Sequence, residues 1–286
     1  MEQTMIKTEN LSKRFGSFAL QDIHFELPAG YICGLIGENG AGKTTLLKIL
    51  AGLYEYDGTV YLEGKEYRAN QMELQQEIGF VFHEEWFDDW DSLIANSRHY
   101  GKYYKHYDET LLKEYLKRFR LDGKKKYKKL SKGEKLKFAF AFALAHHPKL
   151  LLLDEPGVGV DPLSRRELWK MVSELAVGGM SVLWSTAYMD EAERCAHVLM
   201  LDQGSLVYQG PPAGFTGRVA KRVFSFVPPS GEARAMLARW QQEPDIRDAL
   251  IQGNRIRVVL RNPHDGPFSR KGVELHPVEP RLEDAY

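Results

Sequence analysis

Apolar and polar positions along the chain alternate in two ways, which predicts both strands and helices. Short apolar or alternating runs typical of β-strands come first, and a glycine-rich turn leads from them into a helix-like stretch at residues 43–53. The early strand-like runs cover residues 6–11, 20–27, 31–36 and 59–62. This order of strand, turn and helix predicts an α/β core.

A helical pattern replaces this alternation between about residues 89 and 147, most clearly at 109–119 and 132–145. Strands and helices alternate again after it. The later elements are expected at residues 149–154, 162–176, 181–185, 189–195, 197–201 and 205–208. Alternation of this kind is typical of an α/β protein with a parallel sheet, here with an inserted helical block.

The segment QGPPAGFTG at residues 209–217 predicts a domain boundary, because two prolines and three glycines interrupt the pattern. We expect a main domain at residues 1–216 and a small α+β accessory domain at residues 217–286. The best elements of the accessory domain, in the order strand, helix, strand, strand, include residues 222–227, 232–241 and 255–260.

The composition is that of an ordinary globular protein, and the charge balance gives no reason to expect nucleic acid, since 39 basic residues match 39 acidic ones. Cys33 and Cys195 fit no metal-ligand or redox spacing, so we expect two reduced thiols in a cytoplasmic protein. The apolar runs are far shorter than the roughly 20 residues of a membrane-spanning helix. Association with a membrane is therefore expected only through a partner.

The run GENGAGKT at residues 37–44 predicts a phosphate-binding loop, because it matches G-x-x-x-x-G-K-[ST] between an apolar strand and a helix. Glycines allow successive backbone N–H groups to surround a phosphate at the helix N-terminus. Lys43 is expected to reach the β- and γ-phosphates, and the Thr44 hydroxyl to bind Mg²⁺. The residues expected to contact nucleotide here are Gly37, Asn39, Gly40, Gly42, Lys43, Thr44 and Thr45.

A second chemical signal is LLLLDE at residues 150–155, an apolar strand that ends in two adjacent carboxylates. Asp154 is suited to the coordination shell of Mg²⁺, and Glu155 is suited to polarise an attacking water. A pair of acids after a buried strand can also be a simple solvated loop. The phosphate loop upstream favours the catalytic interpretation.

The run LSKGEK at residues 130–135 enters a long helix. Together with the phosphate loop and LLLLDEP in this order, it makes residues 4–210 resemble the nucleotide-binding subunits of ABC transporters. In that family the signature serine and glycine, here Ser131 and Gly133, bind the γ-phosphate held by the opposite subunit. Lys132 and Glu134 depart from the usual LSGGQ. Without the family, the serine would be interpreted only as a helix cap.

The resemblance implies a P-loop NTPase fold with a mixed sheet core, an N-terminal antiparallel β subdomain and a helical subdomain at about residues 89–147. It also implies ATP and Mg²⁺ as ligands, ATP hydrolysis coupled to transport, a second nucleotide-binding subunit and a membrane-spanning permease that holds this chain at the inner face of the cell membrane. Hydrolysis is expected to be slow because of the departure at Ala187 described below. The ending VEPRLEDAY resembles that of drug-export ATPases with a small C-terminal domain. An exporter is therefore expected.

Other family positions carry over one at a time. Phe15 matches the aromatic residue that stacks on adenine, and Asp161 matches the acid that contacts the other subunit. His83 occupies the place of a glutamine that touches Mg²⁺ and the attacking water. Ala187 replaces a histidine that contacts the γ-phosphate, and losing one oriented contact of this kind costs about 2.7 to 4 kcal/mol of transition-state stabilisation.

The loss at Ala187 leaves open an alternative from another class, a regulatory or structural subunit that dimerises on ATP with little hydrolysis. A chromosome- or repair-type ATPase would need long coiled coils between the two nucleotide motifs, and the roughly 110 residues here are too few. The run HEEWFDDWDSL at residues 83–93 is expected to form the surface that receives the membrane subunit, or else to pack locally.

Basic residues change type near the middle of the chain. Residues 1–150 contain 18 Lys and 5 Arg, whereas residues 151–286 contain 3 Lys and 13 Arg. The first part resembles Gram-positive export ATPases and the second part Gram-negative multidrug exporters. We therefore consider a chimera of two such ATPases joined near residue 150, with a chance distribution as the alternative.

Overall fold

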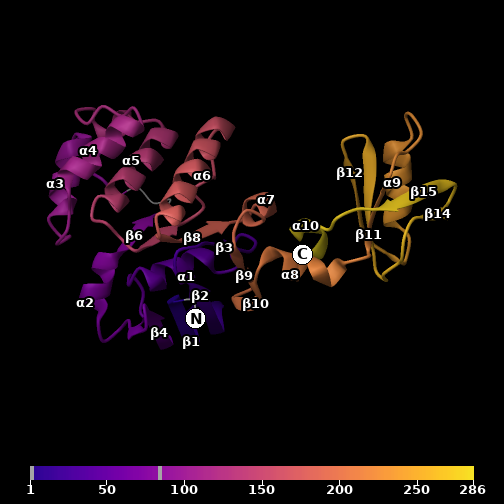
Figure 1. The fold of residues 1–286 in the computed structure, drawn as a ribbon, viewed down its shortest axis with the longest axis horizontal. Coiled ribbons are helices and arrows are strands. Elements are labelled where there is room, and N and C mark those ends of the chain that lie inside the picture. The colour runs from indigo at the N-terminus through magenta and orange to yellow at the C-terminus, as the bar shows by residue number, and fades with distance from the viewer. Residues whose placement is uncertain (1–2, 83–85) are drawn as a thin grey trace. The chain divides into compact units, whose positions relative to one another are not determined.

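The computed structural model describes residues 3–82 and 86–286 and separates into two compact units, Met1–Gln209 and Gly210–Tyr286 (Figure 1). The domain boundary expected after residue 216 remains a prediction. Within the described ranges, no helix has both the length and the apolar character needed to cross a membrane.

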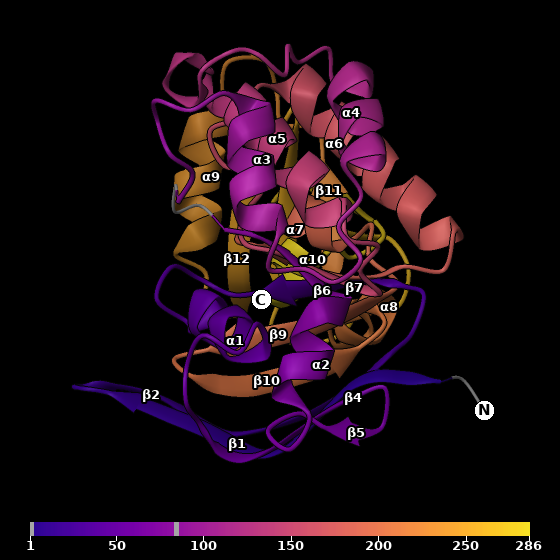
Figure 2. The same ribbon diagram turned by 90° about the vertical axis from the view of Figure 1, so that its left-hand side faces the viewer.

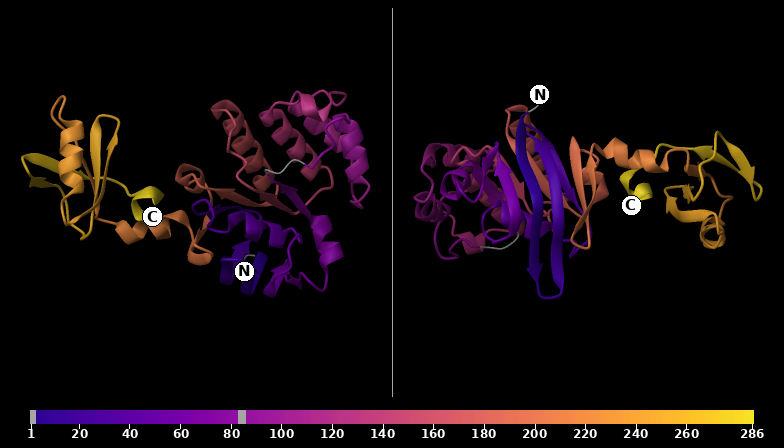
Figure 3. Two further views of the ribbon diagram at one scale, coloured as in Figure 1. Left: turned by 180° about the vertical axis from the view of Figure 1, so that it is seen from behind. Right: turned by 90° about the horizontal axis from the view of Figure 1, so that it is seen from below.

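An antiparallel sheet forms one layer of the first unit, with strand order β2-β1-β4-β5. Its strands are β1 (Thr4–Phe15), β2 (Phe18–Pro28), β4 (Asp57–Leu62) and β5 (Lys65–Glu66). The first two strands form a long ribbon, visible in Figure 3. Each is longer than its apolar run predicts, because exposed polar residues continue the hydrogen-bonded pairing beyond the buried positions.

A six-stranded sheet forms the second layer, with strand order β10-β9-β3-β8-β7-β6. Its strands are β3 (Ile32–Ile36), β6 (Ile78–Val81), β7 (Leu150–Leu153), β8 (Ser181–Thr186), β9 (His197–Asp202) and β10 (Ser205–Gly210). Strand β3 pairs in parallel with β8 and β9, and β7 pairs in parallel with β6 and β8. Their carboxyl ends therefore meet at one edge of the sheet.

Helix α1 (Lys43–Leu50) lies between the two sheets, and α5 (Lys132–Leu144) and α6 (Pro162–Val177) cover the opposite face of the parallel sheet (Figures 1 and 2). The four leucines of β7 are all buried because both faces of that sheet are covered. The remaining short elements of this layer are α2 (Gln71–Leu74), the 3-10 turn η1 (Gln75–Glu77), α6 (Pro162–Val177) and α7 (Met189–Ala192).

The inserted helical block consists of α3 (Leu93–Gly101), α4 (Glu109–Arg118), the 3-10 turn η2 (Tyr127–Lys129) and α5 (Lys132–Leu144). Trp86 stacks on Phe87 with ring centroids 4.0 Å apart, and both contact Phe142 of α5. Trp90 is 67% exposed. Of the three aromatic residues expected on a partner surface, two therefore pack locally and one faces solvent.

The fold class expected from the sequence is confirmed: an α/β P-loop core with an antiparallel β subdomain and a helical region, followed by a C-terminal β region. Helix α1 ends at Leu50, three residues before the end of the predicted helix. The backbone turns there because Gly52 has a φ of 73°, which favours glycine.

The second unit contains a five-stranded sheet, with order β12-β13-β11-β15-β14, where the sequence predicts three strands. Helix α9 packs against one face of it through Met236 and Trp240. The elements are α8 (Pro212–Thr216), η3 (Gly217–Val219), β11 (Val223–Phe226), α9 (Ala233–Gln241), β12 (Ile246–Gln252), β13 (Arg255–Leu260), β14 (Phe268–Arg270), β15 (Val273–Pro277) and α10 (Leu282–Ala285).

A buried ion pair ties the end of the chain to this sheet. The side chains of Arg257 and Asp284 are 8% and 2% exposed, and Nη2 lies 2.5 Å from Oδ2. Asp284 Oδ2 also accepts from the Arg281 backbone N–H, and Arg257 donates to the Glu279 carbonyl. The pair therefore holds α10 in place.

We expect Asp284→Asn to destabilise the second unit by about 3 kcal/mol, because it leaves Arg257 buried without its counter-charge. The free energy of unfolding is measured by urea titration, with hydrogen exchange of residues 210–286 as the readout. Asp265→Asn is the matched control, since its pair with Lys221 is exposed and should change nothing measurable. Equal effects of the two substitutions would contradict the assignment.

Candidate functional site

The glycine-rich loop, residues 37–42, joins the end of β3 to the start of α1. A Cβ atom on Gly37 would lie 2.4 Å from the carbonyl oxygen of Leu201, and one on Gly42 would lie 2.6 Å from Leu20 Cδ2. Gly42 also has a φ of 111°. Glycine is therefore required at both positions, and the tight path of the loop follows from the sequence.

Lys43, the first residue of α1, is 4% exposed and its ammonium turns back into the loop. Nζ donates to the carbonyl oxygens of Gly37 at 2.8 Å and Glu38 at 3.1 Å, and lies 3.1 Å from Glu155 Oε1. Three acceptors thus surround the three protons of the ammonium. Its positive charge lies at a helix N-terminus, where the helix dipole already favours an anion.

Asp154 follows directly after β7 and is 6% exposed. The Thr44 hydroxyl donates to Oδ2 at 2.8 Å, and the Ser185 hydroxyl donates to Oδ1 at 2.9 Å. The two donors come from α1 and β8. Parallel pairing brings the three elements to the same sheet edge, so the buried carboxylate is satisfied by residues far apart in sequence.

Glu155 has a φ of 47°, a left-handed conformation that is rare for residues other than glycine. Its backbone N–H donates to the Ser185 hydroxyl at 2.9 Å, and its carbonyl accepts from the Val158 N–H at 3.0 Å. This conformation turns the carboxylate toward Lys43 rather than along the strand. Backbone strain of this kind collects at functional sites.

The oxygen ligands at this edge fit Mg²⁺, because a hydroxyl and a carboxylate are the hard donors that this ion prefers. Thr44 and Asp154 would hold it, since their oxygens already lie 2.8 Å apart. Bound Mg²⁺ supplies positive charge to the phosphates of a nucleotide. Among the described residues there is no cluster of three metal-ligating side chains, so the phosphates and water would complete the shell.

The remaining residues predicted to contact nucleotide surround this centre. Asn39 and Gly40 are exposed at the tip of the loop, and Thr45 is half-buried in the first turn of α1. Phe15 lies at the end of β1 and is 40% exposed, with its ring 5.2 Å from that of Tyr54. An exposed aromatic ring is available for stacking on a base.

A second group of predicted residues lies at the N-termini of α5 and α6, where Ser131, Gly133 and Asp161 line one pocket of about 370 Å³. The Ser131 hydroxyl accepts from the Glu134 N–H, and the Glu134 carboxylate accepts from the Ser131 N–H. The ammonium of Lys125 beside Glu134 lowers the pKa of that carboxyl. Space is open around Gly133, where an added Cβ would meet nothing within 4 Å.

Asp161 caps α6, with Oδ1 accepting from the N–H groups of Leu163 and Ser164. The bond from the Ser164 N–H is the main reason that the pKa of Asp161 lies below its usual value. The pocket beside it contains none of the described residues 37–45. The structure therefore groups the predicted residues into two separate half-sites.

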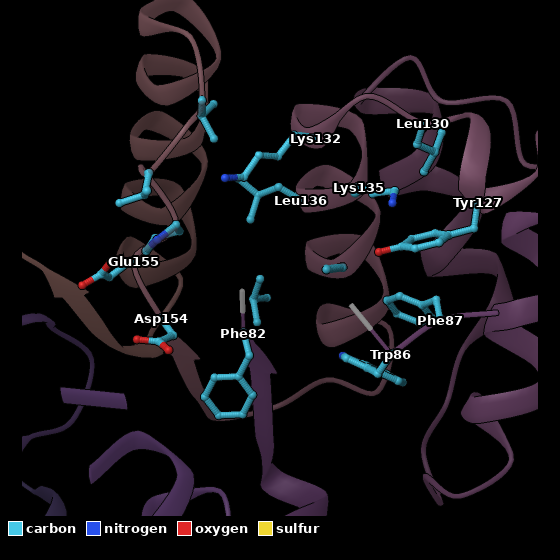
Figure 4. A pocket seen from close by; sticks show the side chains of 15 residues that line it. Phe82, Trp86, Phe87, Tyr127, Leu130, Lys132, Lys135, Leu136, Asp154 and Glu155 are labelled. Carbon is cyan, nitrogen blue, oxygen red and sulfur yellow. The ribbon is translucent and has the colours of Figure 1, made fainter. Parts of the chain in front are cut away.

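A pocket of about 330 Å³ separates the end of β7 from α5 (Figure 4). Asp154 and Glu155 line one side, Trp86 and Phe87 line the other, and the Lys132 ammonium points across it toward the side that carries Glu155. The pocket therefore extends from the two carboxylates into the helical block.

Besides Glu134, described above, three residues depart from the family pattern. His83 lies outside the described residues. Ala187 is exposed directly after β8, so a methyl group occupies the position expected for a histidine. Lys132 lies against Gly159, where an added Cβ would be 2.6 Å from Nζ.

Two residues in or beside this site escape prediction from sequence alone. Ser185 bonds both Asp154 and the Glu155 backbone, and Glu191 in α7 accepts from Thr186 at the end of β8. The run STAYMDEAE contains both residues and is the available signal, but only the pairing of β8 with β7 places Ser185 at the carboxylates.

Comparison with known proteins agrees with this geometry. Residues 20–158 match the family model described as ABC transporter. The probable multidrug ABC transporter ATP-binding protein YbhF of Escherichia coli (strain K12) is 36% identical over 100% of this chain and 52% of its own length. The Nod factor export ATP-binding protein I of Burkholderia lata is 34% identical over 72% of this chain and 71% of its own.

A solved dimer of the ATP-binding cassette MJ0796, bound to ADP and Pi, superposes with a TM-score of 0.65 at 22% identity over 72% of this chain and 98% of that chain. This likeness shows the fold. The chain belongs to the ABC transporter family, among its ATP-binding subunits. It spans about half the length of the YbhF relative.

The chimera hypothesis stays a prediction. The YbhF relative aligns along all of this chain, across residue 150. A junction between two members of one family would preserve such an alignment, so separate comparison of the two halves is the test.

We expect Lys43→Ala to abolish binding of ATP with or without Mg²⁺, because it removes the cation at the loop. Thr44→Val should lower affinity only when Mg²⁺ is present, because it removes one metal ligand. Calorimetric titration with ATP, in Mg²⁺ and in EDTA, separates the two. If Thr44→Val lowers the affinity for ATP as much in EDTA as in Mg²⁺, the metal-binding role assigned to Thr44 is contradicted.

Proposed function

We propose that this chain binds Mg-ATP at the loop of residues 37–45 and hydrolyses it as one half of a nucleotide sandwich that drives a multidrug exporter. The observation that carries the proposal is the ion pair between Lys43 and Glu155, at 3.1 Å, beside the bond from Thr44 to Asp154. These two contacts bring together the proposed phosphate-binding cation Lys43, the proposed metal ligands Thr44 and Asp154, and the candidate base Glu155.

Nucleotide binding changes the partners of these groups. A triphosphate offers Lys43 stronger anionic acceptors than the two backbone carbonyls it now contacts. Glu155 then loses its cation and its carboxylate turns to the attacking water as a general base or orienting group, a role worth about 10²- to 10⁴-fold in rate. Asp154 remains in the metal shell.

The two half-sites support a head-to-tail dimer. Ser131, Gly133 and Asp161 border an open pocket that holds none of the described phosphate-loop residues. The N–H groups at the start of α5 suit a phosphate that a second subunit presents. The MJ0796 relative of the same fold is itself a dimer holding ADP and Pi.

The partner that this dimer drives is a membrane-spanning subunit, and the site of action is the inner face of the cell membrane. The names of the relatives point to export: multidrug transport for YbhF and Nod factor export for the Burkholderia protein. An apolar groove of about 340 Å³ beside the helical block suits a helix of that subunit. Leu53 and Tyr103 border it and are 51% and 66% exposed.

Mixing two inactive variants tests the function and the dimer together. Glu155→Gln should bind ATP but release no phosphate above background, and Ser131→Ala should be similarly impaired by losing its contact with the partner's γ-phosphate. A mixed dimer has one intact site, with Glu155 from one chain and Ser131 from the other. Steady-state phosphate release should therefore reappear on mixing.

The comparison has clear negative outcomes. Wild-type release no greater than that of Glu155→Gln would favour a regulatory subunit without turnover. If the wild type is active but mixing restores no activity, then each active site uses Ser131 and Glu155 of one and the same chain. That result would contradict the nucleotide-sandwich dimer.

Ala187→His should raise kcat by about 10²-fold with little change in KM, because it adds one oriented donor to the transition state. Steady-state phosphate release over a range of ATP concentrations measures this. Ala187→Gln is the control for side-chain size. An unchanged kcat would show that another group already supplies the contact.

A further inference from the structure

A buried carboxylate lies between α6, β8 and α7, outside the nucleotide half-sites. Glu191 is 1% exposed, and its Oε2 accepts from Trp184 Nε1 at 3.0 Å and from the Thr186 hydroxyl at 2.7 Å. The Thr186 hydroxyl in turn accepts from the Tyr188 N–H at 2.9 Å. Glu191 therefore fixes the backbone on both sides of residue 187.

The other oxygen of Glu191 faces the loop that follows Glu155. A Cβ atom on Gly157 would lie 2.5 Å from Oε1, so this oxygen is in close contact with the loop backbone. Gly157 is two residues after the candidate base. One carboxylate thus contacts the loop of Glu155 and the loop of Ala187 together.

Hydrogen bonding in this layer is incomplete. Among the described residues, Glu191 Oε1 accepts no hydrogen bond, and Arg165 Nε and Trp169 Nε1 donate none, although all three atoms are buried. Arg165 Nη1 is 3.9 Å from Glu191 Oε1, which is within ionic reach but too long for a hydrogen bond. An acceptor without a donor thus lies within ionic reach of a guanidinium whose Nε has no acceptor.

Arg165 connects this layer to the second half-site. It lies in the first turn of α6, whose N-terminal cap is Asp161. The Arg165 N–H donates to the Asp161 carbonyl at 2.9 Å, so a displacement of Asp161 moves Arg165 with it. The guanidinium also lies 5.5 Å from the Tyr188 ring centroid.

We infer that Glu191 and Arg165 are a positioning pair, which sets the loops of Glu155 and Ala187 according to the placement of Asp161. The inference rests on the proposed function. It adds a connection within the chain from the half-site of Ser131, Gly133 and Asp161 to the half-site of Lys43 and Glu155. A small shift of α6 brings Arg165 onto Oε1 and completes the hydrogen bonding of a charge that is costly to bury unpaired.

Substitution by glutamine tests the charge while preserving shape. In Glu191→Gln the amide oxygen can still accept from Trp184 and Thr186, but its NH₂ group then faces Arg165, so two donors meet. We expect kcat to fall about 10- to 100-fold from misplacement of Glu155. The Kd for Mg-ATP should stay within about twofold, because Lys43 and Thr44 are untouched.

Arg165→Met should lower kcat similarly, and the Glu191→Gln, Arg165→Met double variant should lose no more than the worse single variant, because one pair is removed. Arg165→Lys should restore part of the loss by returning the charge. Asp190→Asn and Arg166→Met are matched controls at exposed neighbouring positions and should behave as wild type. Multiplicative losses in the double variant would overturn the pairing.

A second readout needs no hydrolysis. Hydrogen exchange should quicken in Glu191→Gln both at residues 156–159 and at residues 186–189, and in neither control. Faster exchange only at residues 186–189, or an unchanged kcat in an active wild type, would overturn the inference and leave the proposed function standing. A wild type that releases no phosphate would defeat the proposed function, while the exchange result would still decide the link between the loops.

Discussion

The negative charge at the end of β7 is the constraint around which the first unit is organised. Asp154 is nearly buried, and an ion in such a place is stable only if its oxygens are paired. Its two donors belong to α1 and β8, and the neighbouring carboxylate of Glu155 pairs with Lys43. These contacts require three elements from distant parts of the chain, the ends of β7 and β8 and the start of α1, to meet at one sheet edge.

The same constraint links binding to chemistry. Lys43 has three acceptors, of which two are carbonyls of its own loop and one is the Glu155 carboxylate. In the proposed function, a phosphate that takes the ammonium would also release the carboxylate, so a single exchange of partners would fill the loop and free the proposed base. Glu155 cannot swing far, because its backbone is held in a left-handed conformation by Ser185. The carboxylate can therefore move only by rotation of the Glu155 side chain and not by movement of the loop.

Sequence reasoning reaches furthest where the signal is local. The loop of residues 37–44 and the Asp154–Glu155 pair follow from motifs of a few residues, and the structure places Lys43, Thr44 and both acids together. Ser185 could not be found in this way, since its role depends on the pairing of Leu153 with Trp184, a register that alternation does not encode. The second unit forms a five-stranded sheet, and its edge strand β14 has only three residues, too few for a periodic signal.

The burial of side chains shows a related limit. The acids around Trp86 and Phe87 suggest exposure, yet both rings lie inside the helical block, because a local sequence does not reveal that α5 supplies Phe138 and Phe142 against them. Glu191 shows the reverse case. It is one acid among several in a short polar stretch, and only its bonds to Trp184 and Thr186 distinguish it from its exposed neighbours.

These contacts bear on the meaning of Ala187. The backbone around this residue is held by Thr186 and the Tyr188 N–H, both anchored on Glu191, although the side chain between them has no polar atom to present. A loop whose only task was to connect β8 to α7 would not need a buried charge to fix it. We therefore expect the position of the loop around residue 187 to affect hydrolysis separately from the absence of a histidine side chain there. Under the proposed function, we expect the absent donor at Ala187, and not a misplaced loop, to limit hydrolysis.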